Sequence, residues 1–324
     1  MTYRARYLLL CLLAMPLPVL AAVPEDDLWI MLEKASQAAH KLSYKGIFVY
    51  QSGRTVSSMQ IAHMNYESGE FTRLISLDGV PREVLRQGND VVIYNPRNEK
   101  VMIEKRRVQS AFPAMLLGMS DRLKASYQVR TAGQERVGGR EGVIIKLEPR
   151  DKYRYGYKFS IDREFGLLLK SVMMNERDEV IEQVAFSQLV MMNGAEGMDW
   201  FRPNPAPGKT YEMQPEETVS PAAVAADGWV VSQLPPGFRK VDQVRRNVPG
   251  KSAPVDHVVF SDGLASVSLF IETLGKAASP KLGYLVQGAT NVYAMTLDGY
   301  QIIVVGEVPE DTVRSIAGAV SFKK

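Results

Sequence analysis

The chain has 324 residues, 46% of them hydrophobic, and this length is typical of two domains that each bury a core. Its 39 basic and 36 acidic residues nearly balance, so the overall charge gives no case for binding nucleic acid. The single cysteine, Cys11, excludes an internal disulfide and a cysteine cluster that binds a metal.

The first 22 residues predict a cleaved secretory signal peptide. Arg4 and Arg6 precede an apolar run over residues 7–20, and Ala21 and Ala22 are the small residues typical of a cleavage site. The apolar run is shorter than the ~20 residues that a membrane-spanning helix needs. We therefore expect an exported protein that does not span the membrane. Its mature form lacks Cys11 and with it thiol chemistry.

The mature chain is expected to begin with a helix over residues 24–43. Its apolar residues recur at helical spacing and form one stripe that should pack on a sheet. The members of this stripe are Leu28, Leu32, Ala35, Ala39 and Leu42.

Residues 44–192 predict an antiparallel sheet. They contain short segments rich in β-branched and aromatic residues, separated by turn sequences. Asp78-Gly79 is the strongest signal in this region for a two-residue hairpin. No segment between the strands is long enough for a parallel crossover helix, so we expect a meander curled into an open or partial barrel.

Residues 110–126 interrupt this pattern with an apolar segment of helical appearance. Two interpretations remain open: a plug that fills the core, or a lid over an apolar cavity of lipid size. A basic run beside the segment, Lys105-Arg106-Arg107, is either a solvated turn or a site for an anionic head group. The residues predicted to contact lipid are Phe112, Met115, Leu116, Met119, Arg106 and Arg107.

A proline-rich connector is expected over residues 201–227, between a domain at 23–200 and a smaller domain at 228–324. Proline interrupts both helices and sheets, so this stretch marks a boundary. Residues 209–213 within it have enough strand character to lie along a domain surface. The second domain predicts hairpins around Asp262-Gly263 and Asp298-Gly299, and a final helix over residues 309–320 that covers a short antiparallel sheet.

No catalytic or metal-binding motif is evident in the sequence. The three histidines, His40, His63 and His257, lack the spacing of a metal site. No serine lies in a GxSxG context, and the GGREG sequence at residues 138–142 lacks the ending of a phosphate-binding loop. We therefore expect neither an enzyme nor a cofactor.

A dense arginine and tyrosine cluster over residues 150–157 is the best candidate for a binding surface. Arginine and tyrosine are enriched among interface anchors. If this stretch is a strand, Tyr153, Tyr155 and Tyr157 share one face and Arg154 lies on the other. Ordinary cross-strand packing explains the cluster equally well.

Several motifs resemble one family along almost the whole mature chain. They are YKGIFVY at residues 44–50, His63 with a GE, RL, LDG and PREV series over residues 69–84, the PRD, RY, Y, D and GLLLKS series over residues 149–171, and Trp229 with LPPGF at residues 234–238. Together they resemble the RseB/MucB family, the periplasmic negative regulators of the sigma-E (AlgU-type) envelope-stress response.

The resemblance implies an α+β fold. Its N-terminal domain is similar to the lipoprotein carriers LolA and LolB, an open antiparallel β-barrel with covering helices, and a smaller α+β domain follows. The implied partner is the periplasmic segment of a membrane anti-sigma factor of the RseA/MucA type, which binding shields from a site-1 protease of the DegS/AlgW type. Lipopolysaccharide or another lipid is the implied releasing ligand.

An alternative function is that of a periplasmic carrier of lipid or lipoprotein. The second domain argues against this alternative, because a carrier needs only the cavity. Oligomeric state is left open, a homo-oligomer included. The residues predicted to contact the partner are Arg82, Arg86, Arg150, Tyr153, Arg154, Tyr155 and Tyr157.

Overall fold

The computed structural model describes ten segments of the chain: residues 23–66, 69–87, 90–95, 100–104, 112–116, 121–192, 212–214, 228–246, 253–275 and 279–322. The predicted signal peptide, most of the connector, and the predicted lipid contacts Arg106, Arg107 and Met119 lie outside them. None of the helices in the described part of the chain is both long and apolar enough to cross a membrane.

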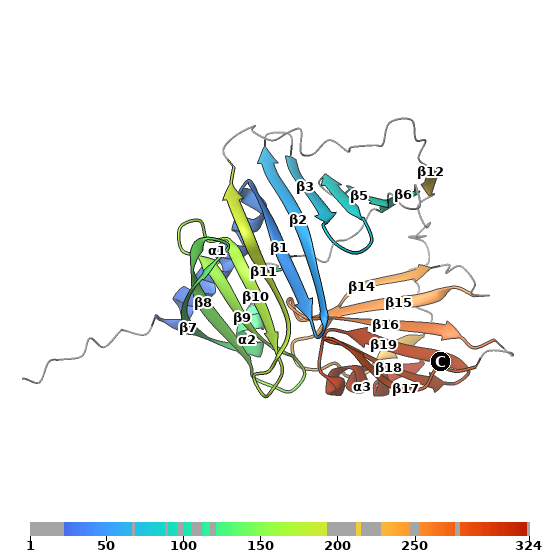
Figure 1. Ribbon diagram of the computed structural model, residues 1–324. Helices are drawn as coiled ribbons and strands as arrows, with labels where there is room; N and C mark the ends of the chain where they lie inside the picture. The colour runs from blue at the N-terminus through green and yellow to red at the C-terminus, as the bar shows by residue number, and fades with distance from the viewer. Residues whose placement is uncertain are drawn as a thin grey trace, which may run out of the picture.

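A large open sheet forms the N-terminal domain (Figure 1). Its strands run in the order β12-β6-β5-β4-β3-β2-β1-β11-β10-β9-β8-β7. All neighbours pair antiparallel except β12 and β6, which pair parallel. The strands are β1 (Tyr44–Ser52), β2 (Thr55–Tyr66), β3 (Gly69–Ser76), β4 (Glu83–Gln87), β5 (Asp90–Asn95), β6 (Lys100–Glu104), β7 (Tyr127–Val137), β8 (Arg140–Pro149), β9 (Gly156–Asp162), β10 (Leu168–Met174), β11 (Val180–Met191) and β12 (Glu212–Gln214).

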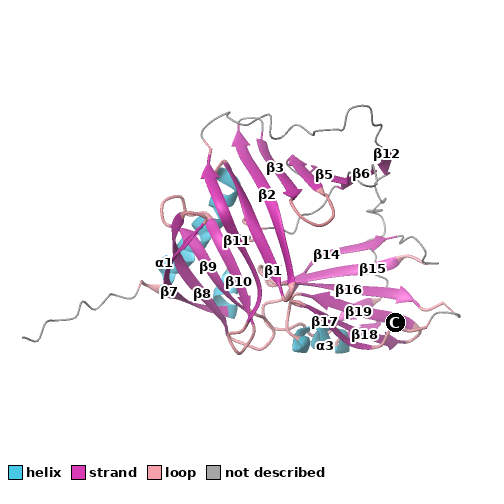
Figure 2. Cartoon of the chain, in the orientation of Figure 1, coloured by secondary structure: helices cyan, strands magenta, loops and turns pink. Residues whose placement is uncertain are grey.

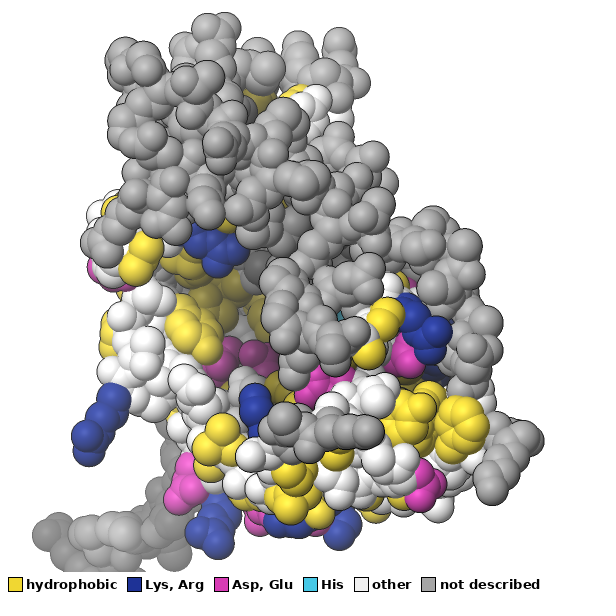
Figure 3. Space-filling view, turned by 90° about the vertical axis from the view of Figure 1, so that its right-hand side faces the viewer, with side chains coloured by type: hydrophobic (Ala, Val, Ile, Leu, Met, Phe, Trp, Pro, Cys, Tyr) yellow, Lys and Arg dark blue, Asp and Glu magenta, His cyan; other side chains and the backbone are white. Residues whose placement is uncertain are grey.

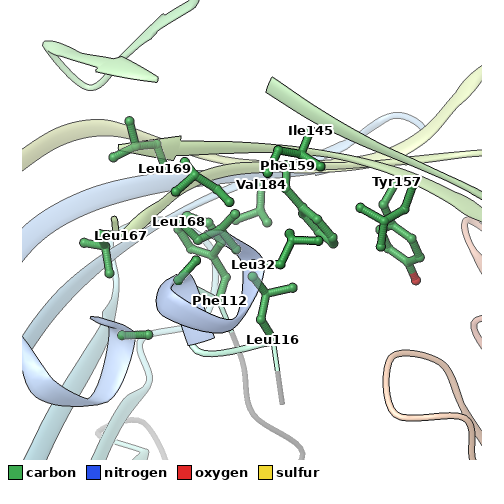
Figure 4. Packing of buried hydrophobic residues seen from close by; sticks show 14 of the residues in the cluster. Leu32, Phe112, Leu116, Ile145, Tyr157, Phe159, Leu167, Leu168, Leu169 and Val184 are labelled. Carbon is green, nitrogen blue, oxygen red and sulfur yellow. The ribbon is translucent and has the colours of Figure 1, made fainter. Parts of the chain in front are cut away.

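Two helices lie against this sheet, α1 (Glu25–Lys41) and α2 (Asp121–Ser126). Helix α1 contacts β2, β7, β9 and β10, so it packs across the inside of the curl (Figure 2). The predicted apolar stripe is confirmed at Leu28, Leu32, Ala35 and Ala39, each no more than 1% exposed. These residues pack into the main core with Phe159 and Leu168, which face them from the sheet (Figure 4).

The C-terminal domain is a smaller sheet in the order β14-β15-β16-β19-β18-β17, all antiparallel. Helix α3 (Glu310–Gly318) packs on β18 and β19 beside a two-stranded β13–β20 ribbon. The strands are β13 (Trp229–Val231), β14 (Arg239–Arg246), β15 (Val255–Ser261), β16 (Ser266–Thr273), β17 (Gly283–Gln287), β18 (Thr290–Leu297), β19 (Tyr300–Gly306) and β20 (Val320–Phe322).

The expected fold class is confirmed: an open antiparallel barrel with covering helices, followed by a small α+β domain. The hairpin at Asp298-Gly299 is confirmed, since both residues have the positive φ, 49° and 82°, that a type I′ turn requires. The two-residue hairpin at Asp78-Gly79 is wrong. Strand β3 ends at Ser76 and β4 begins at Glu83, and the Asp78 carboxylate instead accepts a hydrogen bond from the Ser58 amide at 2.7 Å.

The prediction of a helix over residues 110–126 is only partly confirmed. Residues 112–116 form turns, and only Asp121–Ser126 is helical within the described part of this segment. The strand character predicted for residues 209–213 appears as β12, where Glu212–Gln214 pairs with β6 at the edge of the sheet. The connector therefore contributes one short strand to the N-terminal sheet.

Candidate functional site: the joint between the domains

Arg154 lies at the centre of the contact between the two domains. It belongs to a turn between β8 and β9, and its Nη1 donates to Asp262 Oδ2 of the C-terminal domain at 2.7 Å. Neither side chain is exposed to solvent. Two further donors of Arg154, Nε and Nη2, each contact the Asp151 carboxylate at 3.0 Å, and Nη2 also donates to the Pro236 carbonyl. The planar fork of arginine suits this bidentate, buried arrangement.

The carboxylate of Asp262 is held in place by its own turn. Its Oδ1 accepts hydrogen bonds from the backbone amides of Leu264 and Ala265 at 2.9 and 2.8 Å. Asp262 therefore presents its other oxygen to Arg154 in a fixed direction. A buried ion pair is stable only when its remaining donors and acceptors are also hydrogen-bonded, because each unpaired charge or lone pair would add a desolvation cost.

Polar contacts extend the joint on the side of α3. Thr312 Oγ1 donates to the Tyr153 carbonyl at 2.7 Å, and Asn291 Nδ2 donates to Tyr155 Oη at 2.8 Å. An exposed ion pair joins Lys152 and Asp311 at 2.9 Å. Residues 152–155 thus bind the C-terminal domain through three separate side-chain contacts in addition to Arg154.

Apolar packing also crosses the joint. Ala289, in the turn between β17 and β18, is 2% exposed and belongs to the core of the N-terminal domain. Leu264 packs against the same core. Gly237 allows close approach, since a Cβ at this position would lie 2.6 Å from Ser126 Oγ. The two domains are therefore tightly apposed.

The structure corrects the expected geometry of the arginine and tyrosine cluster. Residues 153–155 lie in a turn, where the Tyr153 amide donates to Asp151 Oδ1, so the three tyrosines do not share a strand face. Only Tyr157 lies in β9, where it is 3% exposed and stacks on Phe159. While the joint is closed, Arg154 and Tyr157 are out of reach of a partner.

The other predicted partner contacts lie away from this centre. Arg150 is exposed and its Nε donates to the Tyr127 carbonyl at 3.2 Å. Arg82 is exposed in the turn before β4, and Arg86 is half-buried in β4 itself. Arg150 therefore contacts the N-terminal domain beside β7, and the other two arginines lie on a different part of the sheet.

The predicted lipid contacts that the structure describes lie in the core. Phe112 is 8% exposed, and its ring centroid lies 5.3 Å from that of Phe48 and 5.0 Å from that of Phe186. Leu116 is fully buried in the same cluster, and Met115 is half-buried (Figure 4). In this arrangement Phe112 and Leu116 fill the inside of the curled sheet.

A second polar cluster, centred on Glu70, has a structural role that the sequence reasoning missed. Glu70 Oε1 accepts from His40 Nδ1 at 2.9 Å and from His63 Nε2 at 3.1 Å. These hydrogen bonds, that from His40 first, hold the pKa of Glu70 well below its usual range. His63 Nδ1 lies 2.8 Å from the Leu42 carbonyl, so both ring nitrogens face acceptors. The cluster ties the end of α1 to β2 and β3.

Both polar centres consist of hydrogen bonds and ion pairs that join elements of the fold. Within the residues that the structure describes, no three histidine, cysteine or acidic side chains are grouped to hold a metal. His63 lies close to Glu70 of the GE motif in the sequence, and this proximity could have predicted the Glu70 cluster. By contrast, Asn291 and Thr312 carried no signal, because nothing in their neighbourhood distinguishes them from surface residues.

Comparison with known proteins gives the same family over most of the chain. A MucB/RseB N-terminal domain model matches residues 29–212, and a MucB/RseB C-terminal domain model matches residues 223–321. The chain is 33% identical to the AlgU regulatory protein MucB of Pseudomonas aeruginosa over 94% of this chain and 92% of that protein. It is 26% identical to the sigma-E regulatory protein RseB of Haemophilus influenzae over 96% of both.

A solved structure gives the same result. The chain resembles a chain of the Pseudomonas aeruginosa MucA/MucB complex with a TM-score of 0.73 and 29% identity, covering 92% of this chain and 99% of that one. These relatives are named as regulatory proteins, not as enzymes. With both domain models matched in order along one chain, the protein belongs to the MucB/RseB family.

Proposed function

We propose that this protein is a periplasmic regulator that binds the periplasmic segment of a membrane anti-sigma factor of the RseA/MucA type. Family membership over both domains supports this role, as does the likeness to a relative solved together with MucA. The single observation that carries the proposal is the closed joint around Arg154. It holds the two domains together, so that both can bind one partner segment.

Binding shields the anti-sigma segment from site-1 proteolysis without any chemistry by this chain. A segment held in extended contact with a folded body cannot enter a protease active site. A standard interface of roughly 1,600 Å² covers such a segment. In the view of Figure 3, hydrophobic side chains lie next to acidic ones on the described part of the surface.

Release follows when lipopolysaccharide or another lipid binds the N-terminal domain. Phe112 and Leu116 occupy the inside of the curled sheet, so an acyl chain has to displace them to enter. Each buried methylene contributes about 0.8 kcal/mol toward that displacement. A nearly complete switch requires the lipid to favour one state by roughly 10⁴-fold.

The test is a protection and competition assay. The purified anti-sigma periplasmic segment is incubated with the site-1 protease, with and without this protein, and then with lipid A added. We expect the protein to block cleavage and lipid A to restore it. Unchanged cleavage in the presence of the protein contradicts shielding. Bound lipid A that leaves the affinity for the segment unaltered contradicts the release step.

A further inference from the structure

Strand β17 is an exposed edge of the C-terminal sheet. Among the described strands it pairs only with β18 (Figure 1). All five of its residues are exposed to solvent. Leu285 is 64% exposed and Val286 53%, and Leu282 just before the strand is 67% exposed. Three large apolar side chains therefore lie beside a row of backbone groups that no other described strand pairs with.

Such an edge is unusual, because natural sheets protect their edges with charged residues, prolines or covering segments. The opposite edge of the same sheet, β14, follows this rule. Its charged residues include Arg239, Lys240, Asp242 and Arg245. Strand β17 has the sequence GYLVQ and contains no charge. The two edges of this sheet thus differ in charge: β14 is a protected edge, and the uncharged β17 has the properties of an edge that binds another strand.

The exposed edge leads directly to the N-terminal domain. The residue after β17, Gly288, lies against Ser52 at the end of β1. The neighbours of Ser52, Gln51 and Gly53, line a hollow of about 270 Å³ together with Val180 and Ile181. Val180 is 59% exposed. A strand rises about 3.4 Å per residue, so a chain paired with β17 reaches this hollow within a few residues.

We propose that β17 is the docking edge for an extended segment of the partner, which adds to the C-terminal sheet as a further strand and continues onto the N-terminal domain at Val180. This inference rests on the proposed function, and the partner segment is the periplasmic segment of the anti-sigma factor. Backbone hydrogen bonds to the edge supply affinity, and the alternating side chains of the segment supply specificity.

The length of the edge favours a flexible segment over a second copy of this chain. Five residues span about 17 Å. Two rigid copies joined along so short an edge would bury far less than the roughly 800 Å² per partner of a stable interface. A flexible segment is not limited in this way, because it also gains contacts beyond Gly288. The segment should carry apolar residues at two adjacent positions, one beside Leu285 on one side of the sheet and the next beside Val286 on the other.

The test compares the two edges of the sheet. Leu285→Lys places a charge on β17, and Val241→Lys places the same charge on β14, where Val241 is 43% exposed. Affinity for the purified, fluorescently labelled anti-sigma periplasmic segment is measured by anisotropy for the full chain. We expect Leu285→Lys to weaken binding by about tenfold or more, the effect of losing one interface anchor. Val241→Lys should stay within about twofold.

Hydrogen exchange of the wild-type chain gives a second readout that needs no variant. Addition of the segment should slow exchange of β17 amides and leave those of β14 unchanged. Equal affinity of wild type and Leu285→Lys, with no protection of β17, overturns the inference while leaving the proposed function intact. Failure of the wild-type chain to bind the segment overturns both. An oligomer that Leu285→Lys converts to monomer, with segment affinity unchanged, shows instead that β17 joins two copies and also overturns the inference.

Discussion

Arg154 and Asp262 form a fully buried ion pair that joins two domains, with a distance of 2.7 Å between Arg154 Nη1 and Asp262 Oδ2. The two residues are 108 positions apart in the chain. Burial of two charges costs several kcal/mol per ion, which their attraction offsets only when the remaining donors and acceptors are also paired. Asp151 and the Pro236 carbonyl supply those partners. The joint is therefore specific for one arrangement of the domains.

Replacing Arg154 with alanine should lower the free energy of unfolding by about 3–5 kcal/mol, because Asp262 remains as an unpaired buried charge. Urea unfolding followed by circular dichroism measures this change. Arg130→Ala is the matched control, since Arg130 pairs with Glu148 at 3.0 Å on the surface and should cost less than about 1 kcal/mol. Equal costs for the two variants would show that the joint does not depend on the buried pair.

Replacing Phe112 with alanine should cost about 3–5 kcal/mol, because its ring packs between Phe48 and Phe186 and its removal leaves a cavity. Phe165→Ala is the control, since Phe165 is 38% exposed and the Arg140 guanidinium lies 4.7 Å from its ring centroid. That change should cost about 1 kcal/mol or less. A neutral Phe112→Ala would contradict the core-plug interpretation and favour a lid.

The parts of the fold that could be predicted are those that depend on the types and spacing of residues close together in the sequence. Helix α1 follows from apolar residues at a spacing of 3.6, and the turn at Asp298-Gly299 follows from residue types that tolerate positive φ. Residues 151–155 form a turn, so the condition under which the tyrosines would share a strand face is not met, although their aromatic residues suggest β structure. The deciding contact was the Asp151 side chain accepting the Tyr153 amide, which competes with strand pairing.

The joint itself could not be predicted from one sequence. Arg154 was singled out as an interface residue, but its partner Asp262 was identified only as a turn residue. Asp262 is both a turn residue and a partner of Arg154, but no local sequence pattern connects it to a residue in another domain. Likewise, the exposed apolar side chains of β17 look like core residues in the sequence, because alternation does not reveal which strand lies at an edge.

Replacing Glu70 with glutamine should reduce the loss of stability in acid. The hydrogen bonds from His40 and His63 hold the pKa of Glu70 well below its usual range. A carboxyl with a lowered pKa in the folded state stabilises that state above its unfolded pKa, and this contribution disappears as pH falls through the folded pKa. The Tm difference between wild type and variant should therefore be largest near pH 6 and shrink below about pH 4.

Glu141→Gln is the control for this measurement, because Glu141 is 64% exposed and its ion pair with Arg136 is on the surface. It should change Tm little, as most exposed pairs contribute at most about 1 kcal/mol. A Tm difference for Glu70→Gln that stays constant from pH 6 to pH 3 would mean that the carboxylate charge does not stabilise the fold.

Replacing Gly237 with alanine should loosen the joint. Gly237 has a φ of 80°, and a Cβ there would lie 2.6 Å from Ser126 Oγ of the N-terminal domain. Gly299→Ala is a matched control, since Gly299 has a φ of 82° but no atom within 4 Å of the added Cβ. The control should cost about 1–2 kcal/mol from backbone strain alone.

Gly237→Ala should cost about 1–3 kcal/mol more than Gly299→Ala, because it adds a steric clash between two domains to the same backbone strain. Urea unfolding measures both costs. Adding Ser126→Ala to Gly237→Ala removes the clashing oxygen and should recover part of the loss, while adding it to Gly299→Ala should recover nothing. Equal costs for the two glycine variants, or no recovery in the double variant, would show that the domains can separate at Gly237 without loss of stability.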